Sequence, residues 1–302
     1  VLLEEAVDAV ITRADGLYVD GTFGRGGHSR AILQRLAPEG RLLVINKDPE
    51  AIAQAQALRE SDARVSVYHG SFADMQKVVT EQFGGLHLSG VLLDLGVSSP
   101  QLDDANRGFS FIKDGPLDMR MNTEQGQSAA QWLKNAAEEE IARVIYEFGE
   151  ERFSRRMAKA IVLARQVEEI TGTLQLAEII KVANPAWERH KHPATRAFQG
   201  IRIFINSELQ EIQQALGIIL DLLATRGRMV VISFHSLEDR IVKQFIQKHV
   251  RGDDFPPGLP ITQDQLNPRL KAIGKAIKVA AQELGENARS RSAVMRIAEK
   301  IA

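Results

Sequence analysis

The stretch Tyr18-Val-Asp-Gly-Thr-Phe-Gly-Arg-Gly-Gly-His28 decides the fold of this chain. The first residues of this stretch complete a short apolar run, which predicts a strand that ends in an acid, Asp20. A helical pattern begins at His28. The turn between them holds four glycines: Gly21, Gly24, Gly26 and Gly27. Glycine lets a backbone approach a ligand closely, and free N–H groups at a helix start suit an anionic or polar ligand end. The stretch therefore predicts a nucleotide-type cofactor loop at the first strand of a doubly wound α/β sheet.

Three cofactor loops compete for this pattern. A P-loop needs Gly-Lys-Ser/Thr, whereas this chain has Gly26-Gly27-His28. A dinucleotide loop needs G-x-G-x-x-G/A, but Ser29 stands at its third position. An S-adenosylmethionine loop remains, because Asp20 can accept from the ammonium of the methionine end and a sulfonium donor has no pyrophosphate to hold. A tight strand-to-helix turn without a ligand stays open as the alternative.

Length and composition limit the class of protein. A chain of 302 residues that is 44% apolar and 25% charged can bury the core of one large or two ordinary domains. It has no cysteine, which excludes disulfides and thiolate metal sites. Its net charge of -1 argues against a globally basic coat for nucleic acid but permits local basic patches.

The chain shows no apolar run of membrane-span length and no signal peptide, so we expect a cytoplasmic protein without a membrane association. Because the sequence begins with Val1 rather than Met, we expect native residues ahead of it.

The first hundred residues alternate between helix and strand patterns. An amphipathic helix comes first and apolar strands follow, at 2–11, then 17–20, 41–46, 64–68 and 89–96. Asp48 and Pro49 open a helix as N-cap and first helical residue. Ser71 with Asp74 predicts a capping box for the next helix. Such alternation predicts a parallel sheet.

The pattern then becomes helical. Residues 104–200 hold no convincing strand, and their helical segments fall at 127–133, 138–148, 150–164 and 173–183. After Pro193 one long helix is expected, whose apolar residues keep 3-and-4 spacing to Leu223. A strand, a helix and two closing strands that pair antiparallel complete the chain, at 228–233, 235–250, 270–277 and 292–298. We therefore predict one α/β domain, residues 1–103 and 201–302, interrupted by a helical substrate-recognition domain, residues 104–200.

Two residues are candidates for the nucleoside part of a cofactor. An acid at the end of the second strand usually holds the ribose, and Asn46 has that position here. Asn can accept one hydroxyl hydrogen bond and donate another, but it lacks the charge that strengthens them. Asp48 could substitute, although its N-cap role is the expected one. Phe72, after the third strand, could flank an adenine or be an ordinary core residue.

Polar residues follow the fourth strand: Asp94, Ser98, Ser99 and Gln101. Reacting groups gather at this edge of open α/β sheets. The lone pair of an exocyclic cytosine or adenine amine is delocalised, and acceptors near its N–H protons favour a more nucleophilic geometry. Asp94, Ser98 and Ser99 are therefore catalytic candidates, with a capped turn as the alternative. His235 follows the fifth strand at the same edge, and since no zinc pattern exists we expect no metal.

Basic residues gather in three places. They are Arg152, Arg155 and Arg156; Arg189, His190, Lys191, His192 and Arg196; and the stretch 265–302. With Trp187 and Phe198 they could form an RNA groove in which phosphates position the strand and aromatics stack on bases. Solvated helix faces are the alternative.

The chain resembles the RsmH (MraW) family in six strings: VDGTFGRGGHS, LLDLGVSSPQLDDANRGFSF, DGPLDMRM, GEERFSRR, HPATRAFQGIRIFINSEL and ISFHSLEDRIVK. The resemblance runs from Val1 to about Ala302. It implies a class I S-adenosyl-L-methionine-dependent methyltransferase with an inserted helical domain. It also implies methylation of the N(4) amine of a decoding-centre cytidine, position 1402, of bacterial 16S rRNA, within the small ribosomal subunit, with a homodimer as a further expectation.

The resemblance also assigns cofactor contacts. Asp20 and Gly24 belong to the loop whose Gly26, Gly27 and His28 would contact the methionine end. Asn46 would meet the ribose, Phe72 would flank the adenine, and Asp94 with Gln101 would complete the pocket. The family has Asp where this chain has Asn46, so we expect weaker cofactor binding. A nicotinamide-dependent oxidoreductase and a non-catalytic RNA-binding protein on the same fold stay open.

Overall fold

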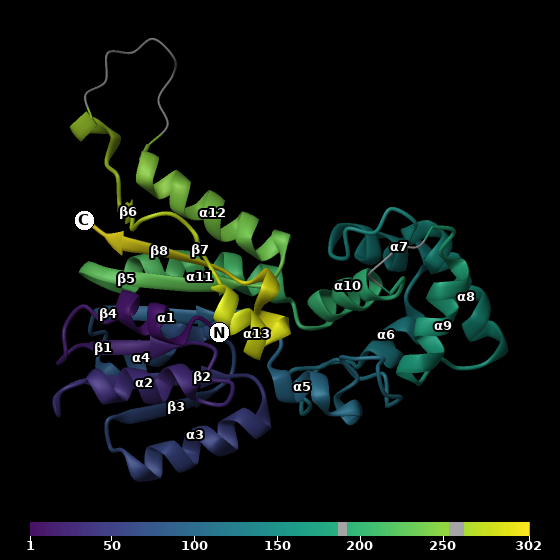
Figure 1. Cartoon of the computed structure of the whole chain (residues 1–302), viewed down its shortest axis with the longest axis horizontal. Coiled ribbons are helices and arrows are strands. Elements are labelled where there is room, and N and C mark those ends of the chain that lie inside the picture. Colours follow the sequence, from purple (N-terminus) through teal and green to yellow (C-terminus); the bar gives the residue numbers. More distant parts are fainter. Residues whose placement is uncertain (187–191, 254–262, 302) are drawn as a thin grey trace. The chain divides into compact units, whose positions relative to one another are not determined.

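The computed structural model describes residues 1–186, 192–253 and 263–301, and it divides into two compact units (Figure 1). The first unit comprises residues 1–96 and 209–302, and the second comprises residues 97–208. The interval 104–200, which we expected as an inserted domain, lies inside the second unit. Each unit is described separately below.

The first unit is built on one sheet of eight strands in the order β3-β2-β1-β4-β5-β8-β6, with β7 paired to β8. Strands β1 to β5 are parallel, and β8 runs antiparallel to β5, β6 and β7. The predicted parallel sheet and the antiparallel closing strands are therefore confirmed. The strands are β1 (Leu17–Asp20), β2 (Arg41–Asn46), β3 (Val65–His69), β4 (Leu88–Asp94), β5 (Leu223–Ser233), β6 (Leu270–Ala272), β7 (Ile277–Lys278) and β8 (Val294–Lys300).

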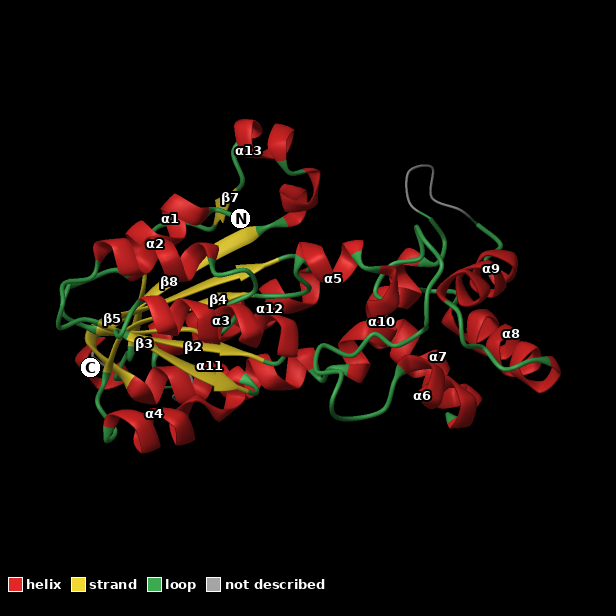
Figure 2. Cartoon of the chain, turned by 90° about the horizontal axis from the view of Figure 1, so that it is seen from below, coloured by secondary structure: helices red, strands yellow, loops and turns green. Residues whose placement is uncertain are grey.

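Helices cover both faces of this sheet (Figure 2). The helices are α1 (Leu3–Val10), α2 (Gly27–Arg35), α3 (Pro49–Ser61), α4 (Met75–Phe83), α11 (Glu208–Leu222), α12 (Ser236–Arg251) and α13 (Ala281–Glu286). Strand β2 shows why a buried strand of this sheet has a continuously apolar sequence. Its Leu42 and Val44 join the core under α1, α2 and α3, whereas Leu43 and Ile45 join the core under α4, α11 and α12. A strand buried on both faces needs apolar residues at every position.

The second unit has a separate apolar core. Its helices are α5 (Ser99–Asp103), α6 (Ala129–Asn135), α7 (Glu138–Glu147), α8 (Ser154–Val167), α9 (Thr173–Ala183) and α10 (Thr195–Ile205). Within the described part of this unit the backbone forms no named strand, only an isolated bridge between Pro116 and Gly172. Phe198, which we expected to stack on RNA bases, is only 4% exposed and belongs to this core, so that prediction is wrong.

The long helix expected after Pro193 is two helices, α10 and α11. The break lies at Asn206 and Ser207, where Ser207 adopts a left-handed φ of 52°. The Asn206 side chain donates to Met119 O at 2.7 Å and accepts from Met121 N at 2.7 Å. These distant contacts stabilise a turn that the apolar spacing alone does not reveal.

Two helix starts also differ from the prediction. Ser71 caps a short 3-10 turn, η1 (Phe72–Asp74), by accepting from Ala73 N at 3.0 Å, and α4 begins only at Met75. The helix expected from Glu150 begins at Ser154, because Glu150 has a left-handed φ of 52°. The N-cap role of Asp48 is confirmed, since its carboxylate accepts from Glu50 N at 3.0 Å.

Candidate functional site

The carboxyl ends of three adjacent strands place ionisable side chains along one edge of the sheet. Asp20 ends β1 and Asp94 ends β4, and His235 follows the end of β5. Asp20 is in register with Leu92 of β4, and Asp94 is in register with Ile232 of β5. This is the edge at which ligands bind in open parallel sheets.

The loop after β1 turns back closely on itself. Gly26, the residue before α2, has a left-handed φ of 75°, and a Cβ there would lie 2.6 Å from the Phe23 ring. At Gly27 a Cβ would meet nothing within 4 Å. The first residue therefore needs glycine for its own conformation, whereas the second leaves open space over the start of α2 that a ligand could fill.

Asp20 holds this loop against α2. The side chain is buried, and its two oxygens accept from Ser29 Oγ at 2.6 Å and from Thr22 N at 3.1 Å. Burial raises the pKa of Asp20 to about 6, against the effect of these two hydrogen bonds. Because both oxygens already have donors, the geometry gives Asp20 the task of shaping the loop.

Among the described residues, one oxygen of Asp94 has no hydrogen-bond donor. Its backbone N–H donates to Thr22 Oγ1 at 2.6 Å, but the buried Oδ1 has no hydrogen-bond partner among the described residues. Burial raises the pKa of Asp94 to about 7, and the neighbouring carboxylates of Asp20 and Glu238 raise it further. A buried polar atom without a partner is rare in folded proteins and marks a place for a donor.

His28 lies beside this carboxylate, with Nδ1 3.8 Å from Asp94 Oδ2 and Nε2 3.1 Å from Val1 O. Burial lowers the pKa of His28 to about 4, so the imidazole is neutral near pH 7. A neutral ring leaves the charge of Asp94 available for a ligand.

Asn46 and Phe72, the two residues predicted to contact the nucleoside part of the cofactor, also lie in the first unit. Asn46 is half-buried at the end of β2, and its Oδ1 accepts from Asp48 N at 2.9 Å. Phe72 is half-buried in η1 and packs on the core under α4. Ser98, Ser99 and Gln101 belong instead to the second unit, where Gln101 Oε1 caps α5 by accepting from Ser98 N at 2.9 Å.

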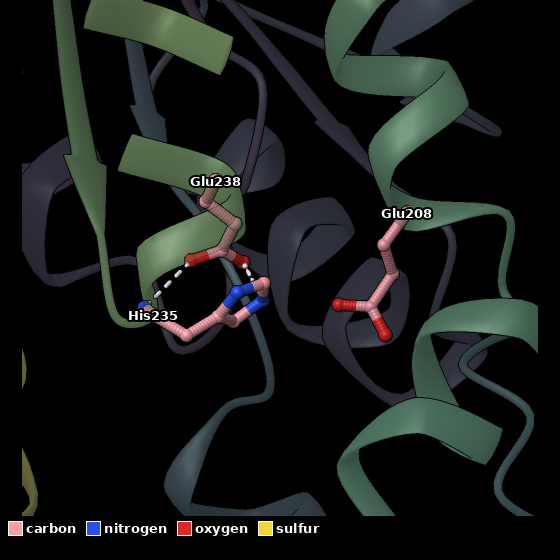
Figure 3. A group of neighbouring side chains, drawn as sticks. All are labelled: Glu208, His235 and Glu238. Atoms are coloured by element: carbon pink, nitrogen blue, oxygen red, sulfur yellow. Dashed lines mark hydrogen bonds and ion pairs between the residues drawn. The ribbon is translucent and has the colours of Figure 1, made fainter. Parts of the chain in front are cut away.

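Glu238 is a site residue that the sequence interpretation missed. It is fully buried in the first turn of α12, where Oε2 accepts from Phe234 N at 2.8 Å and from His235 N at 3.2 Å. Its Oε1 lies 3.1 Å from His235 Nε2 (Figure 3). The signal was an acid three residues after the N-cap residue His235, which is the spacing of a capping box.

Figure 3 also draws Glu208, whose carboxylate receives two hydrogen bonds of 2.9 Å from Arg202. Such a bidentate pair satisfies this carboxylate within the protein. The absence of a metal stays a prediction.

The second unit contains a cationic pocket of about 290 Å³. Arg152, His192 and Arg196 line it, and the Arg152 guanidinium lies 4.4 Å from the centre of the Phe153 ring. Arg155 and Arg156 are exposed on α8. The predicted contributions of Trp187, Arg189, His190 and Lys191 lie outside the described residues.

Comparison with known proteins identifies the family. The sequence model of the MraW methylase family matches residues 1–301. The chain belongs to this family. A "Ribosomal RNA small subunit methyltransferase H" from Nitrosococcus oceani is 56% identical over 301 residues, which are 99% of this chain and 96% of that protein. A protein of the same name from Chromohalobacter salexigens is 56% identical over 302 residues, which are 100% and 91%.

Membership of the MraW methylase family confirms several predictions. The chain is a methyltransferase, and its cofactor is S-adenosyl-L-methionine. The nicotinamide-dependent oxidoreductase is thereby excluded. The solved structure of an rRNA methylase from Streptococcus thermophilus aligns with 98% of this chain and with 92% of its own length, at 9% identity and a TM-score of 0.45. None of the described helices is both long and apolar enough to cross a membrane.

Proposed function

We propose that this methylase transfers the methyl group of S-adenosyl-L-methionine to the N(4) amine of a decoding-centre cytidine, position 1402, of 16S rRNA within the small ribosomal subunit. The observation that carries the proposal is the buried, unpartnered Oδ1 of Asp94 beside the glycine loop. The names of the two relatives support ribosomal RNA of the small subunit as the acceptor.

The residues of the first unit suit this cofactor. The open space at Gly27 would accept the methionine end, and neutral His28 would lie beside it. Asn46 would hydrogen-bond a ribose hydroxyl, and Phe72 would flank the adenine. The bound cofactor supplies an electrophilic methyl group on a sulfonium. The protein's part is to hold that group in line with the acceptor, since positioning supplies much of the rate in such a transfer.

Asp94 would orient the acceptor amine. Oδ1 would accept a hydrogen bond from one N–H, which favours a geometry in which the nitrogen lone pair points at the methyl group. The cytosine must leave its stack to reach the sheet edge, as bases do in other enzymes that modify them. Ser98 and Ser99 stay candidates for a second acceptor.

The second unit would hold the RNA. Arg152 and Arg196 would contact phosphates around the cationic pocket, because arginine forks match phosphate oxygens and fix the position of a strand. Gln101 stays a proposed member of the cofactor pocket, although its oxygen caps α5. The homodimer stays a prediction.

Methyl-labelled cofactor and small ribosomal subunits test the proposal. The wild-type protein should place label in N(4)-methylcytidine at the proposed position, as mapped by nucleoside analysis. Asp94→Ala should fold with an unchanged circular dichroism spectrum and lose at least about 10²-fold in the transfer rate. Full activity of this variant would remove Asp94 from the site. RNA binding without any transfer by the wild type would instead support the non-catalytic alternative.

A further inference from the structure

The closing antiparallel strands bring a basic segment to the sheet edge that holds the candidate site. Strand β8 runs antiparallel to β5, so the first residues of β8 lie beside the last residues of β5. Val294 is in register with Ser233 of β5 and with Lys278 of β7. The row one residue deeper in the sheet consists of Asp94, Ile232, Met295 and Ile277. Lys278 therefore lies one residue beyond the row of Asp94, at three strand spacings, or about 14 Å, from β4.

The helix after β7 contacts the site through the first residues of the chain. Glu283 of α13 accepts a hydrogen bond from Leu2 N at 3.0 Å, and Val1 O lies 3.1 Å from His28 Nε2. The other nitrogen of this imidazole lies 3.8 Å from Asp94 Oδ2. Figure 1 shows β8 starting beside α13 and running from there toward the C-terminus. These contacts place α13, and the turn that follows it, beside the candidate site.

That turn presents two arginines to solvent. It is the 3-10 turn η4 (Ala288–Ser292), which connects α13 to β8. Ser290 at its centre is buried, and its Oγ donates to Asn287 O at 2.6 Å. Arg289 and Arg291, on either side of Ser290, are exposed. Because Ser290 fixes the turn, both arginines lie at the surface next to the start of β8.

The charge at this edge is not neutralised within the described protein. Three exposed cations have no ion pair among the described residues: Lys275, Lys278 and Arg291. Lys275 follows Gly274, whose left-handed φ of 67° turns the chain between β6 and β7. Arg296, within β8, differs because it pairs with Asp239 at 2.7 Å. A group of unneutralised lysines and arginines attracts a polyanion.

We propose that this edge surface binds phosphates of the RNA strand beside the methylated nucleotide. The edge surface comprises Lys275, Lys278, Arg289 and Arg291. This inference rests on the proposed function. Contacts from lysine and arginine to phosphate position a strand without reading its sequence. A separation of about 14 Å is spanned by about four stacked nucleotides of one strand, at about 3.4 Å each, and by fewer when the strand is unstacked. The first unit can thus hold the cytosine at Asp94 and the neighbouring phosphates at the edge surface.

Lys278→Ala combined with Arg291→Ala removes two charges from the edge surface. Binding to small ribosomal subunits is measured with the protein saturated in S-adenosylhomocysteine, so that no methyl transfer is needed. We expect the dissociation constant for subunits to rise by about 10-fold or more. The dependence of log affinity on log salt should become shallower by about 1.4, because each phosphate contact to a single strand contributes about 0.7. The dissociation constant of S-adenosylmethionine should change by less than about 3-fold, with an unchanged circular dichroism spectrum.

Lys248→Ala combined with Lys271→Ala is the matched control. Both lysines are exposed, belong to the first unit and have no ion pair in the described part of the chain. Lys248 lies in the last turn of α12, at the end away from the sheet edge. Lys271 is in register with Glu299, four residues or about 13 Å along β8 from Met295 in the row of Asp94. The control should keep the dissociation constant for subunits within about 2-fold and leave the salt dependence unchanged.

Equal weakening by the two pairs of substitutions, or an unchanged salt dependence in the edge variant, would overturn the assignment. A loss that occurs with subunits but not with protein-free 16S rRNA would also overturn it, because the surface would then contact a ribosomal protein. A lower single-turnover rate at saturating subunits, with an unchanged dissociation constant, would contradict a role in binding. Absence of transfer by the wild type would refute the proposed function alone, since the binding assay does not depend on transfer.

Discussion

Asp94→Asn should stabilise this protein, and increasingly so as the pH rises. The carboxyl is buried, and its pKa is raised from 3.8 to about 7 in the folded state. The folded protein therefore holds this proton to a higher pH than the unfolded chain does. Stability is lost as the pH rises from about 4 through about 7, because the unfolded carboxyl ionises freely over that range whereas the buried one does not.

The magnitude follows from the shift. Each pKa unit corresponds to about 1.4 kcal/mol, so the wild type loses about 4 kcal/mol by pH 8 but only about 2 kcal/mol at pH 5. Asparagine has nearly the same shape and no charge at either pH. The variant should therefore gain about 2 kcal/mol more at pH 8 than at pH 5 relative to the wild type. The same change should weaken methyl transfer less than Asp94→Ala does, because the amide oxygen can still accept an N–H of the amine but lacks the charge that strengthens the bond.

Urea unfolding, followed by circular dichroism, measures the difference in stability between the variant and the wild type at pH 5 and at pH 8. Asp15→Asn is the matched control, since Asp15 is exposed and its pKa is lowered to about 2 by the hydrogen bond from Arg13. That control should gain no stability as the pH rises. A gain in Asp94→Asn that is absent, or equal at the two pH values, would refute the claim that a buried, proton-holding carboxyl lies at the end of β4.

Three further variants test the cofactor loop, by calorimetric titration with S-adenosylmethionine for binding and by urea unfolding for stability. Asn46→Asp should tighten binding by about 5- to 10-fold, because a charged acceptor is stronger by about 1 kcal/mol; an unchanged dissociation constant would mean that this side chain does not touch the ribose. Gly26→Ala should lower the free energy of unfolding by at least about 1 kcal/mol, because of its left-handed φ and the Phe23 ring 2.6 Å from the new Cβ. Gly27→Ala should leave unfolding unchanged but weaken cofactor binding, since its Cβ meets only open space; unaltered affinity would show that no ligand approaches there.

The sequence predicts most of the fold because its signals are local. Continuous apolar runs identify β2 and β4, and Asp48-Pro49 identifies the start of α3. The break between α10 and α11 could not be predicted, because the apolar spacing continues across it. It depends on Asn206, whose partners Met119 and Met121 lie more than eighty residues earlier in the chain.

The site was predictable to a similar degree. The glycine loop, Asp20 and Asp94 follow from their positions at strand ends, since parallel strands bring such ends to one edge. The sequence does not show which carboxylate is already satisfied. Ser29 and Thr22 occupy the oxygens of Asp20, whereas one oxygen of Asp94 has no partner among the residues that the structure describes. Only the folded geometry separates the two.

A crystal structure of the wild-type protein with S-adenosylhomocysteine tests the central claim most directly. We expect the nucleoside to lie over the start of α2, with its ribose at Asn46 and its adenine against Phe72, and a ligand or acceptor donor within hydrogen-bond distance of Asp94 Oδ1. A ligand bound away from the loop after β1, or an Asp94 Oδ1 that stays unpartnered in the complex with cofactor and RNA, would contradict the account.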